Sequence, residues 1–195
     1  MNLDYNEEYK SFEKEVQDFC KQYKDISFSD GAKIPFSANG GKNKNLIKRS
    51  DWQKILIEKG YFARSVPKEY GGYGGETDIL KSRIIASEFS KFKIPTPMGG
   101  QGIDMLVPTL LELGTEQQKE EYIRPTLHGE MIWCQGYSEP NAGSDLASLQ
   151  TKAVLIDGEW VINGQKIWTS TAQYAHMMFC FCLLYTSDAA DDLLC

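Results

Sequence analysis

Apolar residues in the first part of the chain recur every three or four positions, which is the spacing of one helix face. This pattern predicts a helix near the amino end, with one face made of Tyr5, Tyr9, Phe12, Val16, Phe19 and Tyr23. A second helix is predicted from Ser50 to about Gly60, because Ser50-Asp51-Trp52-Gln53 has the form of a capping box. The polar segment 31–45 between the two helices predicts a loop.

Three further helices are predicted before residue 130. Residues 78–92 have the amphipathic pattern, and Pro95 and Pro97 break the chain after them. Residues 104–113 are apolar and predict a buried helix that ends at Gly114. The sequence Thr115-Glu116-Gln117-Gln118 is a second capping box, and the helix that it opens is expected to stop near Pro125.

A glycine-rich run separates the second helix from the third, with four glycines in the five positions 71–75. Such a run could cradle a phosphate group. The P-loop spacing and its Lys-Ser/Thr pair are missing, however, and no hydrophobic strand precedes the glycines. A tight turn between helices is therefore the preferred interpretation.

The hydrophobic period changes after Met131. Residues 153–156 and 159–162 are apolar and flank Asp157-Gly158, the dipeptide most typical of a two-residue hairpin turn. Residues 165–170 predict another strand. We therefore expect a helical domain over residues 1–130 and the start of a β domain over 131–181.

Composition and charge narrow the class of protein. Hydrophobic residues make up 42% and charged residues 25% of the 195, which is typical of a soluble globular chain. A net charge of -6 and a pI near 5.0 argue against nucleic-acid binding. The amino end lacks a basic and apolar signal segment, and no run reaches the length of a membrane span. These features predict a cytoplasmic protein.

No metal or disulfide framework is predicted. The five cysteines match no zinc pattern and no C-x-x-C pair, and their number is odd. His128 and His176 are isolated, so a solvated or structural histidine is the preferred interpretation of each.

Residues 133–147 combine small residues, a proline and two hydroxyl groups where a strand gives way to a loop. Such a stretch lets the backbone approach a flat ligand while amides and hydroxyls donate hydrogen bonds. A structural turn is the other interpretation, and the residue pattern alone leaves both open.

The run Glu139-Pro140-Asn141-Ala142-Gly143-Ser144-Asp145 resembles the signature of the acyl-CoA dehydrogenase family. Three more segments resemble that family in the same order, namely residues 66–72, 114–119 and 163–170. The resemblance covers most of residues 5 to 181. Asn141 departs from the glycine that is most common after the proline, and asparagine tolerates left-handed backbone angles well enough to keep the turn.

The resemblance implies a fold, a cofactor and site residues. The fold is α+β: a helical domain, then an incomplete β-barrel domain, with the family's carboxyl-terminal four-helix domain missing. The cofactor is FAD. Ser138 would bond the pyrimidine edge of the flavin, and Ser144 would also meet the acyl-CoA substrate. The full set of implied flavin-binding residues is Gln135, Gly136, Tyr137, Ser138, Gly143, Ser144, Trp168, Thr169 and Ser170.

The implied reaction is α,β-desaturation of an acyl-CoA thioester, with electron-transfer flavoprotein as the acceptor and a homo-oligomer as the full-length form. In most of the family the glutamate that takes the α-proton lies in the carboxyl-terminal domain. We therefore assign no catalytic residue here, and Glu139 is not given that role. The 195-residue chain is expected to be an inactive fragment with weak or no flavin binding.

Two alternatives stay open from the sequence. One is an acyl-CoA oxidase or flavin monooxygenase of the same fold, and the other is a helical interaction module without a cofactor. The resemblance to the family stops after Phe181. Residues 182–191 resemble the conceptual translation of a sequencing adapter, so 182–195 are expected to be a non-native tail.

Overall fold

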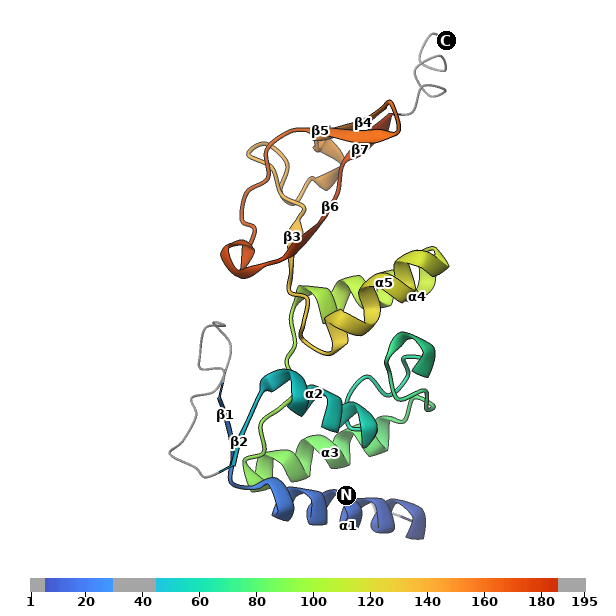
Figure 1. Ribbon diagram of the computed structural model, residues 1–195, viewed down its shortest axis with the longest axis vertical. Coiled ribbons are helices and arrows are strands. Elements are labelled where there is room, and N and C mark those ends of the chain that lie inside the picture. The colour runs from blue at the N-terminus through green and yellow to red at the C-terminus, as the bar shows by residue number, and fades with distance from the viewer. Residues whose placement is uncertain (1–5, 30–44, 186–195) are drawn as a thin grey trace. The chain divides into compact units, whose positions relative to one another are not determined.

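The structure is a computed structural model that describes residues 6–29 and 45–185 (Figure 1). Contacts divide the chain into two units, residues 1–131 and residues 132–195, which are described in turn as the helical unit and the strand unit. Within the described residues, no helix combines the length and the apolar character needed to cross a membrane.

The helical unit contains five α-helices and one short pair of parallel strands in its described part. A single 3₁₀ turn, Lys68–Tyr70, and a π-helical turn, Gly102–Leu106, connect some of them. The strands are β1 (Ile26–Phe28) and β2 (Asn45–Ile47). The helices are α1 (Glu7–Tyr23), α2 (Arg49–Glu58), α3 (Ile79–Phe92), α4 (Val107–Leu113) and α5 (Glu116–Leu127).

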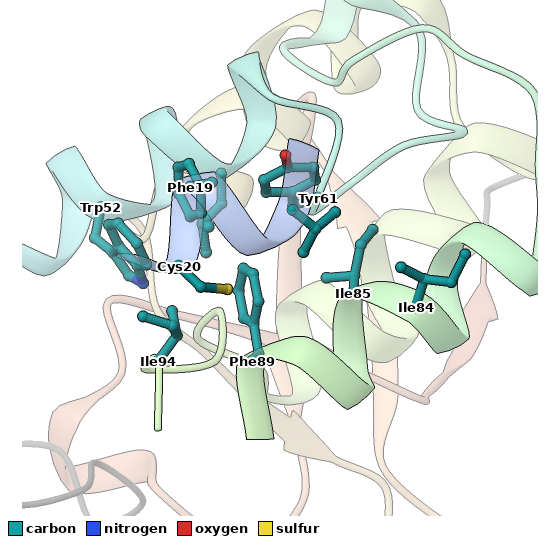
Figure 2. Close-up of a cluster of buried hydrophobic side chains, with 10 residues drawn as sticks. Phe19, Cys20, Trp52, Tyr61, Ile84, Ile85, Phe89 and Ile94 are labelled. Carbon is teal, nitrogen blue, oxygen red and sulfur yellow. The ribbon is translucent and has the colours of Figure 1, made fainter. Parts of the chain in front are cut away.

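An aromatic core holds α1, α2 and α3 together (Figure 2). The ring of Phe19 stacks on those of Trp52 and Phe89 at centroid distances of 5.7 and 6.0 Å. The predicted face of α1 is confirmed, because Val16 and Phe19 are buried and Tyr9, Phe12 and Tyr23 pack against the same cluster. Tyr5 lies outside the described residues. The spacing of apolar positions therefore placed this helix correctly.

The capping box predicted at Ser50 is wrong. Helix α2 begins at Arg49, its N-cap Lys48 makes no side-chain cap bond, and Ser50 is already inside the helix. The Gln53 side chain is used elsewhere, since it accepts from the Met98 amide at 2.9 Å and donates to the Leu127 carbonyl at 3.1 Å. The predicted stop is confirmed, because α2 ends at Glu58 and Gly60 follows with φ +70°.

The predictions around α3 are confirmed. Asp78 caps this helix by accepting from the Lys81 amide at 2.9 Å, and the chain leaves helical structure before Pro95. The glycine-rich run forms a turn, with Gly71 at φ +89° after the 3₁₀ turn. A Cβ at Gly71 would lie 2.8 Å from the Arg124 Cγ, so the close approach of α5 also requires a glycine. The loop predicted over 31–45 falls almost wholly outside the described residues.

The prediction about α4 needs correction, and those about α5 are confirmed. Leu113 of α4 is 76% exposed, and Val107 is the fully buried residue of this helix, so the helix is not buried as predicted. The capping box of α5 is confirmed, with Thr115 and Gln118 bonded reciprocally. The helix ends at Leu127, near Pro125 as predicted. The proline removes only one backbone hydrogen bond, and the His128 amide still donates to the Arg124 carbonyl at 3.0 Å.

The strand unit contains two separate sheets in its described part. Strands β3 (Trp133–Gly136) and β6 (Met177–Cys180) pair in parallel. The other sheet has the order β5-β4-β7, from Glu159–Asn163, Lys152–Ile156 and Leu183–Tyr185. The described strands close no barrel. The α+β prediction, with helices followed by an incomplete β part, is confirmed.

The predicted hairpin is confirmed, and the predicted strand after it is wrong. Asp157 and Gly158 have φ of 52° and 84°, the positive pair that a type I′ turn requires. Residues 165–170 form no strand. Trp168 has φ 56°, which is incompatible with the extended backbone of a strand.

Candidate functional site

A tight turn carries the Glu-Pro signature of the strand unit. The Glu139 amide donates to the Ala142 carbonyl at 2.8 Å, and the Ala142 amide donates back to the Glu139 carbonyl at 3.1 Å. Ala142 is buried, while Pro140 and Asn141 are exposed. Asn141 does not adopt a positive φ, so this turn tolerates asparagine without using left-handed backbone angles.

The Glu139 carboxylate is buried and fully engaged. It accepts hydrogen bonds from the Gln150 amide at 2.6 Å, the Thr151 amide at 2.9 Å and the Lys166 Nζ at 2.8 Å. The Lys166 ammonium, with help from the two amides, lowers the pKa of Glu139 from 4.5 to about 2. A carboxylate held in this way is a poor proton acceptor at neutral pH, which agrees with leaving it without a catalytic role.

Lys166 brings two of the predicted flavin segments together. Its Nζ also donates to the Tyr137 carbonyl at 3.0 Å, and the next amide, that of Ile167, donates to the Ser138 carbonyl at 2.9 Å. Residues 135–138 and 168–170 are thus neighbours in space although they are separated in sequence. Sequence reasoning missed the role of Lys166. The signal that could have indicated it is the pair of oppositely charged residues, Glu139 in the first motif and Lys166 in the second.

The first flavin segment leaves the end of β3. Gly136 lies close to β6, and a Cβ there would lie 2.6 Å from the Met178 sulfur, so a larger residue would force that side chain to move. The ring of Tyr137 stacks on Phe181 at 4.0 Å and meets the Phe179 ring edge-on at 5.6 Å. Gln135 and Ser138 are half-buried. The Tyr137 ring is therefore packed within the strand unit.

Trp168 is the most unusual residue of the second segment. Its side chain is 84% exposed, and its backbone has φ 56°, an angle that bulky residues rarely adopt. Thr171 has φ 69°, and the Ser170 amide donates to the Trp168 carbonyl at 2.9 Å. Thr169 is half-buried and Ser170 exposed. Strained backbone combined with an exposed large aromatic ring is a feature of ligand-contacting segments.

Gly143 and Ser144 lie in the exposed loop after the turn. A Cβ at Gly143 would meet nothing within 4 Å, so no packing demand explains this glycine. The structure therefore brings the segments around Ser138 and Trp168 together, and the roles of Gly143 and Ser144 stay a prediction.

The histidines have structural contacts. His176 accepts from the Ile132 amide at 3.0 Å through Nδ1, and burial lowers the pKa of His128. Among residues 6–29 and 45–185, no three His, Cys, Asp or Glu side chains are grouped so that they could hold a metal ion. Cys20 and Cys134 are buried free thiols, and Cys195 lies outside the described residues.

Family models match nearly the whole chain. The acyl-CoA dehydrogenase N-terminal domain matches residues 6–130, and the acyl-CoA dehydrogenase middle domain matches residues 134–194. The second match extends beyond Phe181, where the motif-based resemblance stopped. The non-native character of residues 182–195 stays a prediction.

Individual relatives agree with the family models. The chain is 37% identical to acyl-CoA dehydrogenase IpdE1 of Mycolicibacterium smegmatis over 150 residues, which are 72% of this chain and 38% of that protein. It is 40% identical to the short-chain specific acyl-CoA dehydrogenase of Clostridium acetobutylicum over 131 residues, 67% of this chain and 34% of that protein.

Solved structures show the same fold. The ChsE4-ChsE5 complex of Mycobacterium tuberculosis has a TM-score of 0.61 at 27% identity, covering 98% of this chain and 45% of that one. An acyl-CoA dehydrogenase of Bacillus anthracis complexed with FAD has a TM-score of 0.56 at 25% identity. The match covers 94% of this chain and 30% of that one. The chain thus spans less than half the length of these relatives, and it belongs to the acyl-CoA dehydrogenase family of FAD-dependent oxidoreductases.

Proposed function

We propose that this chain supplies part of the flavin site of an enzyme that introduces an α,β double bond into an acyl-CoA thioester. The observation that carries the proposal is the junction of two segments in the strand unit. Lys166 and the Ile167 amide join the Ser138 segment to the Trp168 segment, and both segments match the family's motifs.

The residues present fit a flat, largely apolar ring with a polar edge. Trp168 offers an exposed indole face, and such faces stack well on aromatic ligands. The hydroxyls of Ser138, Thr169 and Ser170 stand in the same two segments and can donate or accept hydrogen bonds. We assign Ser138 to the pyrimidine edge and Trp168 to the face of the ring, with Gln135, Gly136 and Tyr137 forming the wall before the turn.

The reaction needs a proton acceptor, a hydride acceptor and stabilisation of the charge that develops on the thioester carbonyl. FAD, when bound, would accept the β-hydrogen as hydride, and electron-transfer flavoprotein would then take the electrons. Gly143 and Ser144 are proposed to meet the flavin and, through Ser144, the acyl-CoA. Glu139 cannot take the α-proton while it is bound to Lys166, so no residue of this chain is given that task.

The test compares this chain with a form of the protein that has the length of its relatives. The longer form is expected to bind FAD, to form a homo-oligomer and to be reduced by an acyl-CoA, whereas the 195-residue chain is expected to bind FAD weakly or not at all and to turn nothing over. In the longer form, Trp168→Ala should weaken FAD binding at least tenfold. Trp160→Ala is the matched control, because Trp160 is an exposed indole on the hairpin.

Three results would each contradict one part of the proposal, namely the cofactor, the electron acceptor or the inactivity of the 195-residue chain. A longer form that binds no FAD would leave only a helical interaction module. Production of peroxide in place of electron transfer to a flavoprotein acceptor would indicate an acyl-CoA oxidase. Turnover of an acyl-CoA by the 195-residue chain would overturn the prediction that it is inactive.

A further inference from the structure

One ion pair in the strand unit is almost completely withdrawn from water. The side chains of Lys166 and Glu139 are 8% and 7% exposed, and their charged atoms lie 2.8 Å apart. Every other ion pair in the part of the chain that the structure describes has at least one partner that is substantially more exposed, except for the weak 4.0 Å contact of Lys81 with Asp78. This pair, here called the clamp, is therefore an unusual feature of the unit.

Burying the clamp costs hydration free energy, which hydrogen bonds must offset. Two charges taken out of water lose hydration that their attraction only partly restores, and apolar replacements are often equally stable. Here the carboxylate accepts from two amides as well as from the ammonium, and the ammonium has a second acceptor in the Tyr137 carbonyl. These hydrogen bonds offset part of the lost hydration and also make the pair strongly directional.

The clamp joins three stretches of backbone that are far apart in sequence. Glu139 holds the amides of residues 150 and 151, and Lys166 holds the carbonyl of Tyr137. One residue after Lys166, the Ile167 amide bonds to the Ser138 carbonyl, and Trp168 follows with its left-handed φ. A strained angle persists only where neighbouring structure over-determines it, and the clamp lies next to this one.

We propose that Lys166 is a positioning residue for the flavin site. By binding both the Tyr137 carbonyl and the Glu139 carboxylate, it fixes residues 135–138 against residues 168–170, so that both segments face one ligand. The inference rests on the proposed function, because it assigns the two segments to the same flavin. Lys166 lies within the segment 163–170 that resembles the family, and the inference gives it a role that the resemblance did not assign.

The first test is local hydrogen exchange in the 195-residue chain. Lys166→Met keeps the apolar stem and removes the charge and both bonds. Amide exchange at Gln150, Thr151 and Ile167 should become at least tenfold faster, while the ladder of β4 and β5 should be unchanged. Lys152→Met is the matched control, since Lys152 is the other described lysine of this unit and is exposed. Unchanged exchange at all three amides would overturn the proposal.

A variant that unfolds would show itself by faster exchange in the β4–β5 hairpin as well. In that case the measurement uses Glu139→Gln in place of Lys166→Met, because glutamine keeps an oxygen that can accept a hydrogen bond from Lys166. Faster exchange at the three amides, with the hairpin intact, supports the clamp. Exchange equal to that of the unmodified chain overturns it.

The second test separates positioning from simple stabilisation. In a longer form that binds FAD, Lys166→Met should weaken FAD binding about tenfold at a temperature where the protein is folded, and Lys166→Arg should restore most of the affinity. Equal affinity in Lys166→Met would reduce the clamp to a structural pair and overturn the proposal. If the unmodified longer form binds no FAD, the proposed function fails, and the exchange measurement alone decides whether the clamp joins the two segments.

Discussion

The two units of this chain are stabilised in different ways. The described helical unit buries a cluster of aromatic and aliphatic side chains around Phe19, Trp52 and Phe89. The described strand unit buries few apolar side chains, and its buried charged groups are the Glu139 carboxylate and the Lys166 ammonium. Apolar burial acts at any pH, whereas an ion pair depends on the charge of both groups. The helical unit should therefore respond to packing mutations and the strand unit to acid.

Exposure of the strands reinforces the contrast. Ile162 and Leu184 are more than half exposed, and neighbouring Trp160 and Val161 are nearly so. Single exposed apolar residues are ordinary, but several on one small sheet make an apolar surface that soluble proteins usually cover. The strand unit thus derives less stability from side-chain packing than the helical unit does.

The largest expected effect is in the aromatic core. Trp52 is 2% exposed, stacks on Phe19 and donates its indole N–H to the Pro95 carbonyl at 3.0 Å. Trp52→Ala should lower the free energy of unfolding of the helical unit by about 3–5 kcal/mol, because it removes a large buried side chain and leaves a cavity. Urea unfolding followed by the helical circular dichroism signal measures this.

Its control lies in the strand unit. Val161→Thr changes a half-exposed strand position at nearly constant shape and should shift stability by no more than about 0.5 kcal/mol. If the two substitutions had equal effects, the contrast between a packed unit and a thinly packed one would be broken.

The next effect tests polar burial inside the helical unit. The amide of Gln53 is completely buried and bridges the Met98 amide and the Leu127 carbonyl. Gln53→Met keeps the length of the side chain but leaves both backbone groups unpaired, which should cost about 2 kcal/mol. Gln117→Met, on the exposed side of α5, is the matched control and should be near neutral. If Gln53→Met left the free energy of unfolding unchanged, these buried hydrogen bonds would not contribute to the stability of the helical unit, and apolar packing alone would account for it.

Acid should weaken the clamp in the strand unit. The pKa of Glu139 is lowered to about 2, so its contribution is fully present above its ordinary pKa of 4.5 and is lost as the pH falls through about 2. Hydrogen exchange at the amides of Gln150, Thr151 and Ile167 should rise across this window in the unmodified chain. The readout must be local, because the pKa values of Asp78 and Glu116 in the helical unit are lowered as well.

Two variants sharpen this acid test. In Glu139→Gln these three amides should already exchange faster at neutral pH, and their exchange should lose most of its dependence on pH between 4.5 and 2. Glu159→Gln removes an exposed carboxylate from the same unit and should keep the full dependence. An acid response that survives in Glu139→Gln would show that another group controls it.

Local sequence signals predicted most of the helices and the hairpin. The spacing of apolar residues in α1, the capping box at Thr115 and the Asp157-Gly158 turn each act through neighbours a few residues away. The capping box at Ser50 failed because Gln53 found tertiary partners, Met98 and Leu127, that no local pattern reveals. The hydrogen bonds of the Gln53 side chain are therefore set by residues distant in sequence, and not by the local capping pattern.

The candidate site shows the same limit. The motif around Ser138 was visible in the sequence, and the residues near Trp168 were assigned through the family resemblance. Their junction was not visible, because the bonds from Lys166 to Tyr137 and Glu139 cross more than 25 positions. The strand predicted over 165–170 failed for a related reason. Its apolar residues matched a strand, but the positive φ of Trp168 is imposed by surrounding structure.

The smallest effect concerns a surface cap. Thr115 accepts from the Gln118 amide at 3.2 Å, and the Gln118 side chain accepts from the Thr115 amide at 3.0 Å, both in exposed positions. Thr115→Ala should destabilise the helical unit by about 1 kcal/mol, because one bond of the capping box is lost while water satisfies the freed amide. Thr115→Ser keeps the hydroxyl and should restore nearly all of that loss in the same urea titration. A loss as large as that of Trp52→Ala would mean that local capping, and not the aromatic core, limits the stability of this unit.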